Sequence, residues 1–314
     1  MKVFLTGASG HVGTVVVSEL LSAGHEVIGL ARSDTSAQLL VKAGAKAHRG
    51  SLDDMESLTT GVQDADGVIH LAFKHDVAFS GNMVGAAEAD MKALTVIAKA
   101  LEDTSKPLVG VNGTLAYGVA YPGHTTIETD MLPSGPRITS ENFIIGVAAK
   151  NIRSSVVRLA PTVHGPLDNA VGFIPTLIRV ARDKGFSAYI GDGLNRWPAV
   201  HERDAAKLFR LAVESAPAGS RLHAVHDQDI VFKDIAEAIG NKLNLPIKRV
   251  TLDEAHKHFG HLAYFVSVDN PTSSQMTQEL LNWEPVQLRL IDDLNKGHYF
   301  KANEMKDEQN EASV

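Results

Sequence analysis

Three glycines near the start of the chain, Gly7, Gly10 and Gly13, stand three residues apart in the stretch TGASGHVG. They follow an apolar run (residues 2–6) that predicts a buried strand, and they open an apolar-periodic run (residues 13–23) that predicts a helix. Such glycines let the backbone approach a ligand closely, while the free amides and the dipole of the helix attract an anion. The arrangement therefore favours a dinucleotide diphosphate in this loop over a glycine-rich turn without a ligand.

Each glycine has its own expected task in such a loop. Gly7 lets the chain turn out of the strand, Gly10 lets the backbone approach the diphosphate, and Gly13 lets the helix pack closely on the sheet. The other loop residues that we expect at the cofactor are Ser9, His11 and Val12. We expect the histidine side chain to flank the phosphates or to face solvent, without a catalytic role.

The second predicted strand (residues 26–31) is followed by Arg32 and Ser33. In NAD-binding sheets an acid stands about 20 residues after the glycines and holds the ribose 2′-hydroxyl. Here an arginine takes that place, and its planar guanidinium suits a 2′-phosphate, with the serine as a further donor. The sequence therefore favours NADP(H) over NAD(H). Two alternatives remain: Asp34 binds a ribose hydroxyl, or Arg32 is a solvated loop charge.

Short apolar runs alternate with longer amphipathic runs through the first half of the chain. Further strands are predicted over residues 45–49, 67–73, 107–112 and 154–160. Helices are predicted over residues 36–43, 82–102 and 136–150, and Asp53 with Glu56 resembles a capping pair that opens another short helix. Strands that alternate with helices form right-handed βαβ units, so we expect an α/β fold with a Rossmann-type, doubly wound parallel sheet.

After Pro161 the alternation loosens, and we expect a smaller, interleaved, mainly helical C-terminal lobe that binds the substrate. Its elements are predicted near residues 171–183, 187–191, 204–214, 222–226, 232–243, 251–259, 272–282 and 288–298. Thr251 and Glu254 fit a capping box. The expected domains are a dinucleotide-binding domain over 1–165 with a sheet-returning segment near 196–230, a substrate lobe over 166–195 and 231–300, and a flexible tail over 301–314.

The stretches TGASGHVG, EVIGLAR, GVIHLAF and VVRLAPTVHG resemble the short-chain dehydrogenase/reductase superfamily, in particular its extended branch, the NAD-dependent epimerase/dehydratase group. The similarity extends to about residue 230 and is most specific in the glycine loop and the fourth strand. It implies that Asp53 contacts the adenine amino group, with a plain helix cap as the alternative. It also implies that the cofactor lies along the following residues: Leu71, Ala72, Phe73, Asn112, Pro161 and Val163.

In this superfamily a tyrosine and a lysine four residues later move the proton, and the sequence departs from that pattern because it contains no Tyr-x-x-x-Lys. When Glu141 is matched to a glutamate that often follows the pair, Arg137 falls on the lysine position and Pro133 on the tyrosine position. An arginine can bind the nicotinamide ribose, but a proline cannot act as an acid.

Four other residues are candidates for the missing chemistry. Thr114 follows the fifth strand, where the resemblance implies a hydroxyl that orients the substrate oxygen. Tyr117 and Tyr121 lie in the next loop and are candidate acids, with rim packing as the alternative for both. His75 follows the fourth strand, and its ordinary pKa near 6.5 suits a proton donor, with a plain surface loop as the alternative.

The segments at 161–165 and 196–204 also resemble family segments near the site. His164 is a secondary candidate for proton transfer, and Arg196 with Trp197 is expected to line the substrate pocket. Asp204 is expected to cap a helix, and His201 is expected to tie the second lobe to the sheet.

Composition excludes several classes of protein. The net charge of −7 repels nucleic acid, and the absence of cysteine excludes disulfides and thiolate metal sites. No stretch is apolar enough for a membrane span, and the N-terminus does not resemble a signal peptide, so we expect a cytoplasmic protein. His256, His258 and His261 have metal-like spacing but are not expected to bind zinc, and no Gly-x-Ser-x-Gly motif supports a hydrolase.

Three functions remain in order of preference. The first is an NADP(H)-dependent carbonyl reductase or alcohol dehydrogenase that acts on a small carbonyl or alcohol substrate with a substituted proton donor. The second is a non-catalytic NADP(H)-binding regulator or redox sensor, which the missing pair favours. The third is a sugar-nucleotide epimerase or dehydratase. The resemblance further implies a homodimer through the helices near 82–102 and 136–150.

Overall fold

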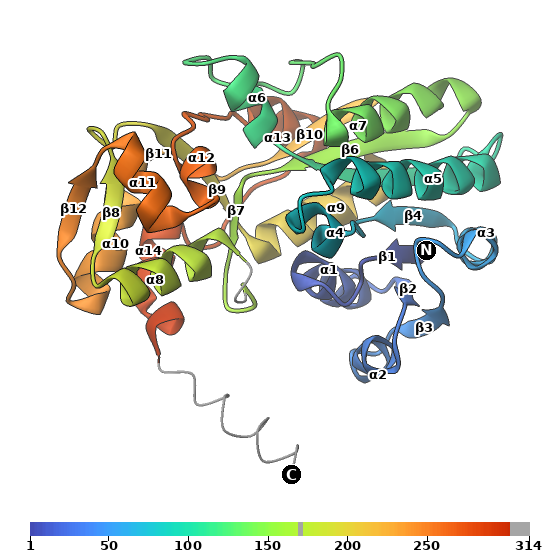
Figure 1. Cartoon of the computed structure of the whole chain (residues 1–314). Coiled ribbons are helices and arrows are strands. Elements are labelled where there is room, and N and C mark those ends of the chain that lie inside the picture. The colour runs from blue at the N-terminus through green and yellow to red at the C-terminus, as the bar shows by residue number, and fades with distance from the viewer. Residues whose placement is uncertain (169–171, 302–314) are drawn as a thin grey trace, which may run out of the picture.

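A seven-stranded sheet, in which every pairing is parallel, forms the centre of the computed structural model, which describes residues 1–168 and 172–301 (Figure 1). The spatial order is β10 (Ser220–Ala224), β6 (Arg153–Leu159), β5 (Pro107–Gly113), β4 (Gly67–His70), β1 (Lys2–Thr6), β2 (Glu26–Ala31) and β3 (Lys46–Arg49). The chain winds outward from β1 in both directions, so the predicted Rossmann-type, doubly wound fold is confirmed.

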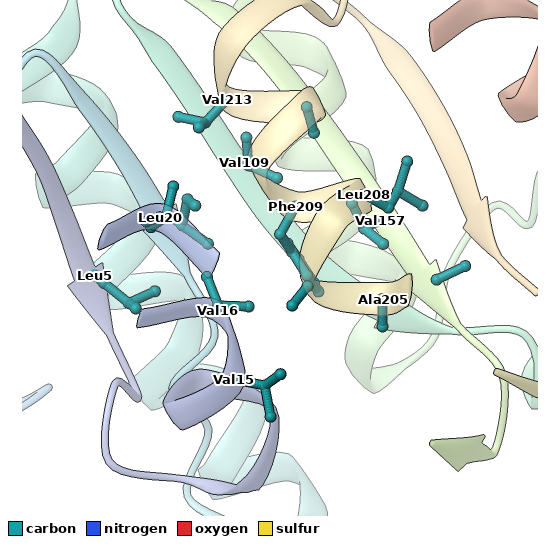
Figure 2. Close-up of a cluster of buried hydrophobic side chains, with 14 of the residues drawn as sticks. Leu5, Val15, Val16, Leu20, Val109, Val157, Ala205, Leu208, Phe209 and Val213 are labelled. Carbon is teal, nitrogen blue, oxygen red and sulfur yellow. The ribbon is translucent and has the colours of Figure 1, made fainter. Parts of the chain in front are cut away.

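One face of the sheet is covered by α1 (His11–Ser22), α2 (Asp34–Lys42) and α9 (Glu202–Ser215). Figure 2 shows how valine and leucine side chains of α1 and Phe209 of α9 meet over the sheet residues Val109 and Val157. These side chains are almost completely buried, and the removal of their apolar surface from water stabilises the layer. The helix α9 comes from the second half of the chain, so the two halves share one core.

The other face is covered by α3 (Met55–Gln63), α5 (Met83–Leu101) and α7 (Pro136–Gly146), which continues into a short 3-10 helix, η1 (Val147–Lys150). Leu94 and Ile97 of α5 lie in one buried cluster with Ile144 of α7 and Phe4 of β1. This packing holds the first turn of α7 beside the carboxyl ends of the central strands.

Two short helices lie beyond the carboxyl ends of the strands, α4 (His75–Phe79) after β4 and α6 (Leu115–Ala120) after β5. The strand predicted over 67–73 is too long, because β4 ends at His70. Its neighbour β1 ends at Thr6, whose carbonyl accepts from the amide of Leu71 and whose hydroxyl accepts from the amide of Ala72. The last three predicted strand residues therefore turn over the end of β1 toward the site.

The second lobe is mainly helical, as predicted. Its helices and its parallel strand pair are α8 (Phe173–Lys184), β8 (Ser187–Ile190), α10 (Phe232–Leu243), β12 (Ile247–Val250), α11 (Leu252–Phe259), α12 (Leu262–Val266), α14 (Leu290–Lys296) and a 3-10 helix, η2 (His298–Phe300). The predicted capping box is confirmed, because the Thr251 side chain accepts from the Glu254 backbone amide and the Glu254 side chain accepts from the Thr251 backbone amide. Of the predicted tail, residues 302–314 lie outside the described residues.

A second sheet joins the part built on the seven-stranded sheet to the second lobe. In it, β9 (Arg196–His201) lies between β7 (Thr162–His164) and β11 (Asp227–Val231). The sequence analysis missed all three strands and also β12, since each is short and lacks a strict alternation of apolar residues. It also missed α12, which is too short to show a helical period. The strand predicted at 222–226 lies at the sheet edge as β10, and α13 (Gln275–Leu281) packs against it.

Phe209 tests whether the shared core stabilises the fold. Its side chain is fully buried between α1 and the sheet, so Phe209→Ala should lower the free energy of unfolding by about 3–5 kcal/mol. Urea unfolding followed by circular dichroism measures this loss. Leu39→Ala on α2 is the control, since Leu39 is exposed and should change the midpoint very little. Equal effects of the two substitutions would contradict the assignment of the core.

Candidate active site

The glycine loop is built by backbone contacts that leave no room for side chains. Gly7 has a φ of 70°, and a Cβ atom there would lie 2.8 Å from the amide nitrogen of Ala72. A Cβ atom on Gly13 would lie 2.0 Å from the carbonyl oxygen of Gly7. The sequence analysis expected Gly13 to bring the helix onto the sheet, but the close approach is between the helix and the loop itself.

Gly10 is the N-cap of α1, so the amides of the first turn lie at the mouth of this loop. The mouth combines helix amides, the positive end of the helix dipole and bare backbone, and this combination fits a diphosphate. Ser9, half-buried, lies in this loop and Val12 lies in the first turn of α1, and the expected contacts of both with the cofactor stay predictions.

The side chain of His11 is largely buried, which contradicts the expectation that it faces solvent; the expectation that it flanks the phosphates stays a prediction. Its Nε2 lies 2.8 Å from Oε2 of the buried Glu202 at the start of α9, and its Nδ1 lies 4.0 Å from Asp168. Burial raises the pKa of Asp168 to about 7, although His11 and a hydrogen bond from Tyr299 oppose this rise. The imidazole therefore ties the start of α1, at the glycine loop, to the start of α9.

Arg32 is exposed at the end of β2, and the hydroxyl of Ser33 is used as the N-cap of α2, accepting from the amide of Ser36. The sequence analysis missed a second arginine at this edge. Arg49 ends β3 opposite Ala31, and its guanidinium binds the carbonyl of Ser33 and lies 2.7 Å from Asp34. A basic residue at the end of the third strand was the signal that could have found it.

Asp53 is exposed, and its carboxylate lies 2.7 Å from Nζ of Lys74, which follows β4. The alternative of a plain helix cap is wrong, because the N-cap of α3 is Asp54, which accepts from the amide of Ser57. The capping pair expected of Asp53 and Glu56 is therefore shifted by one residue. The ion pair connects the end of β3 with the end of β4 across the cofactor edge.

Arg137, which the resemblance matches to the lysine of the family pair, lies in the first turn of α7. One guanidinium nitrogen donates to the carbonyl of Val111 on β5 at 2.7 Å, and the guanidinium carbon lies 4.2 Å from the centre of the Phe73 ring. A cation is thus held at the carboxyl ends of β4 and β5, next to the Ala72 backbone that contacts the glycine loop.

His75 joins this group from α4. Its ring contacts Phe73 edge to face, with centroids 5.2 Å apart, and a tilted contact with Phe79 lies on its other side. The side chain is exposed at the surface, but packing between the two rings partly desolvates it. This desolvation lowers the pKa of His75, and the positive charge of Arg137 lowers it further against the opposing effect of Asp76.

Tyr117 is not an accessible acid, which corrects its nomination from the sequence. Its side chain is 0% exposed, and its hydroxyl donates to Oε1 of Glu141 at 3.0 Å. The ring lies under Arg158, whose guanidinium carbon is 4.0 Å from the ring centre. Burial and the negative charge of Glu141 raise the pKa of Tyr117 well above its usual range, so the phenol stays protonated and bound.

Thr114 and Asn112 are also occupied by the protein. Thr114 is fully buried, and its hydroxyl accepts from the side-chain amide of Asn270, which comes from the second lobe. Asn112 donates to Oε2 of Glu141 at 2.6 Å. Neither side chain points to an open site, because each is hydrogen-bonded to a buried polar partner, Asn270 or Glu141. Tyr121 is half-buried and donates to the carbonyl of Met131, so its hydroxyl hydrogen is also used.

Glu141 is the acceptor at the centre of this buried network. Arg158 of β6 binds it at 2.6 Å with both side chains fully buried, and Arg221 of β10 binds the same oxygen at 3.0 Å. Burial alone would raise the pKa of Glu141, but hydrogen bonding and charge from Arg158 outweigh it and hold the pKa below its usual range. The carboxylate therefore stays charged and joins α7, β5, β6 and β10.

The remaining predicted residues lie around β7 and β9. Pro161 and Val163 are half-buried, while His164 is buried with its Nδ1 2.8 Å from Asp293. His201 lies opposite His164 where β9 pairs with β7, and its expected role in tying the second lobe to the sheet stays a prediction. His201 is also the N-cap of α9, which corrects the role given to Asp204.

Two of the assignments in this region, those of Asp204 and Trp197, need correction. Asp204 accepts from the amides of Val286 and Gln287, so it anchors that segment. Trp197 is buried against Phe173 and Phe232 in the core of the lobe, and Arg196 forms an ion pair with Asp269. The burial of Trp197 contradicts its expected place in a substrate pocket, whereas that of the half-buried Arg196 stays a prediction.

Two general expectations can be compared with residues 1–168 and 172–301. Within these ranges, no cluster of three or more histidine or acidic side chains is arranged to hold a metal ion. None of the helices in the same ranges combines the length and apolar composition that a bilayer span requires.

The fold and the glycine loop define a Rossmann-type dinucleotide-binding protein. The profile of the NAD-dependent epimerase/dehydratase family matches residues 3–225. The chain therefore belongs to that family, whose members are NAD(P)-dependent oxidoreductases and epimerases, and the predicted resemblance is confirmed.

Several individual proteins are similar to the chain. The uncharacterized protein C2A9.02 of Schizosaccharomyces pombe is 44% identical over 300 residues, which cover 96% of this chain and 100% of that protein. A decarboxylating sterol-4-alpha-carboxylate 3-dehydrogenase of Dictyostelium discoideum is 28% identical over 246 residues, covering 74% and 73% of the two chains. In fold, the dTDP-glucose 4,6-dehydratase DesIV of Streptomyces venezuelae, solved with NAD bound, matches with a TM-score of 0.76 at 18% identity, over 96% and 98% of the chains.

The buried network predicts a large loss of stability for one isosteric substitution. Glu141→Gln removes the charge that faces Arg158 and Arg221, which leaves buried cations without a counterion and should lower the free energy of unfolding by about 3–5 kcal/mol. Urea unfolding measures the effect. Glu26→Gln is the control, because its ion pair with Lys46 is exposed and should contribute little. A Glu141 variant as stable as the control would show that the network is dispensable.

Proposed function

We propose that the chain is an NADP(H)-dependent oxidoreductase of the carbonyl reductase or alcohol dehydrogenase type. The observation that carries this proposal is the meeting of Arg137 and His75 on the Phe73 ring, beside the backbone of Ala72 that closes on the glycine loop. A cation and a titratable donor thus stand together at the carboxyl edge of the sheet, where doubly wound folds bind ligands.

The cradle of the glycine loop fits the diphosphate of a dinucleotide, because Cβ atoms at Gly7 and Gly13 would fill it. When bound there, NADPH supplies a hydride to the carbon of a substrate carbonyl. Arg137 takes the place of the family lysine and binds the nicotinamide ribose. His75 donates the proton to the substrate oxygen, since it is exposed while Tyr117 and Thr114 are buried in other contacts.

The preference for NADP(H) is supported by two arginines at one edge. Arg32 follows β2, and Arg49 ends the neighbouring β3 with its guanidinium beside Ser33. Because Arg49 already pairs with Asp34, that acid is less suited to a ribose hydroxyl than an unpaired acid would be. A 2′-phosphate, in contrast, would gain two guanidinium partners.

A second candidate function is an NADP(H)-binding regulator without turnover. It is favoured by the burial of Tyr117 under Arg158 and by the absence of Tyr-x-x-x-Lys from the sequence. The oxidoreductase is the better proposal, because the likeness to a sterol dehydrogenase and to an NAD-bound dehydratase fold supports a working cofactor site. An epimerase or dehydratase reaction ranks third, since it would need a tyrosine in the position where Pro133 stands.

Turnover of NADPH with a panel of small aldehydes and ketones tests the proposal. His75→Asn should lower kcat by about 100-fold, because general acid catalysis typically contributes at least that much, while NADPH affinity stays unchanged. Reduction should also slow as the pH rises through an apparent pKa below the ordinary histidine value of about 6.5, and the variant should lack this step. Tyr121→Phe is the control and should keep its turnover. Tight NADPH binding without turnover on any substrate would favour the regulator instead.

Cofactor choice gives a separate prediction. Arg32→Gln and Arg49→Gln should each weaken NADPH binding by roughly tenfold and leave NADH binding nearly unchanged, because each removes one charged hydrogen bond to the 2′-phosphate. Isothermal titration calorimetry with both nucleotides measures the ratio. Arg179→Gln, an exposed arginine of α8, is the matched control. An unaltered ratio in both variants would refute the assignment of the 2′-phosphate site.

A further inference from the structure

A series of buried polar side chains leads, contact by contact, to Arg137. Thr6 ends β1, His70 ends β4 and Asp90 lies on the buried face of α5. Thr6 Oγ1 is 2.9 Å from His70 Nδ1, and His70 Nε2 is 3.1 Å from Asp90 Oδ1. The other carboxylate oxygen of Asp90, Oδ2, is 3.7 Å from Nη1 of Arg137. The series thus extends from β1, which leads into the glycine loop, to α7, which carries Arg137.

Donors and acceptors can be assigned along this series of side chains in one way that uses every donor. The amide of Ala72 donates to Thr6 Oγ1, so the threonine hydroxyl is free to donate to His70 Nδ1. The proton on Nε2 of the imidazole is then donated to Asp90 Oδ1. A doubly protonated imidazole would leave the threonine hydroxyl hydrogen unused within these contacts. The side chains of Thr6 and His70 therefore orient Asp90 so that Oδ2 faces Arg137.

Asp90 remains charged despite its burial. Desolvation alone would raise the pKa of Asp90, but the hydrogen bond from His70 and the positive charge of Arg137 outweigh it, so the pKa lies below its usual range. Arg137 is in turn held by three different contacts: the carbonyl of Val111, the ring of Phe73 and the carboxylate of Asp90. Of these three, only the carboxylate neutralises the guanidinium.

We propose that Asp90 is a positioning residue that, oriented by His70 and Thr6, holds Arg137 in place to bind the nicotinamide ribose. The inference rests on the proposed function, because it takes Arg137 as the partner of that ribose. It adds a connection between the two ends of the cofactor site. Thr6 directly precedes Gly7 of the diphosphate cradle, so this series of side chains links the cradle with the cation at the opposite end.

Calorimetry with two ligands tests the inference without a need for turnover. NADPH contains the nicotinamide ribose, whereas adenosine 2′,5′-bisphosphate lacks it but keeps the adenosine and its 2′-phosphate. Asp90→Asn should weaken NADPH binding by roughly tenfold and leave the affinity for the bisphosphate unchanged, because only NADPH reaches Arg137. Glu88→Gln, at an exposed position of the same helix, is the control and should bind both ligands like the wild type.

A double substitution distinguishes positioning from an independent role. If Asp90 acts through Arg137, the Asp90→Asn/Arg137→Gln protein should bind NADPH as weakly as Arg137→Gln alone. An additive loss would overturn the inference, as would unchanged NADPH affinity in Asp90→Asn or an equal loss for both ligands.

Failure of the proposed cofactor site has a different signature, since the wild type would then bind neither ligand. NADPH binding without turnover would overturn the oxidoreductase alone and leave this binding test unchanged. Should Asp90→Asn not fold, His70→Leu carries the same test, because it removes the donor that orients Asp90. The selective loss of NADPH affinity is again expected. A loss for both ligands or for neither in that variant would overturn the inference.

Discussion

The rest of the structure depends on one close backbone contact, the approach of Gly7 to Ala72. The end of β1 and the end of β4 meet so tightly there that a single methyl group would collide with the backbone. This contact closes the glycine loop, where we propose that the diphosphate binds, and it also directs residues 71–73 over the strand ends. Phe73, and through it Arg137 and His75, therefore take their positions from the same glycine that shapes the phosphate loop.

The buried charge network has a complementary effect on the opposite side of the site. Glu141 attracts Arg158, Arg221, Asn112 and the hydroxyl of Tyr117, and in a buried environment each of these groups requires such a partner. The segment after β5 is thereby fixed in place. Its polar residues stabilise the architecture, and the groups left accessible for chemistry lie on the side of β4 instead.

The elements with strong local patterns were predictable. The strands β1, β2 and β5 and the long helix α5 were found within a residue or two, because continuous apolar runs and a regular helical period are properties of the local sequence. The short strands β7, β9 and β11 were missed, because three to six residues carry too little periodicity. Their pairing depends on segments that meet only after folding, as His164 does with His201.

The candidate site residues likewise divide into those that local sequence could place and those whose surroundings depend on distant segments. The match of Arg137 to the family lysine rests on its spacing from Glu141 on one helix, which is a local property, and it stays a prediction. The structure puts both side chains on the sheet. Tyr117 and Thr114 were misjudged as accessible, since their residue types suit catalysis but say nothing about burial. Arg49 was overlooked because its place beside Ser33 follows from the pairing of β3 with β2, so its basic character at the end of a strand becomes informative only together with that pairing.

The sequence by itself determined the glycine loop, the alternation of strands and helices in the first half of the chain, and the absence of the Tyr-x-x-x-Lys pair, because each is a matter of residue type and spacing along the chain. Only the tertiary structure decided which polar side chains stay accessible. Burial and partnership arise between segments far apart in the sequence, as when Asn270 covers Thr114 and Glu202 binds His11. The free energy of a polar group depends on those neighbours, so its role could not be read from its identity.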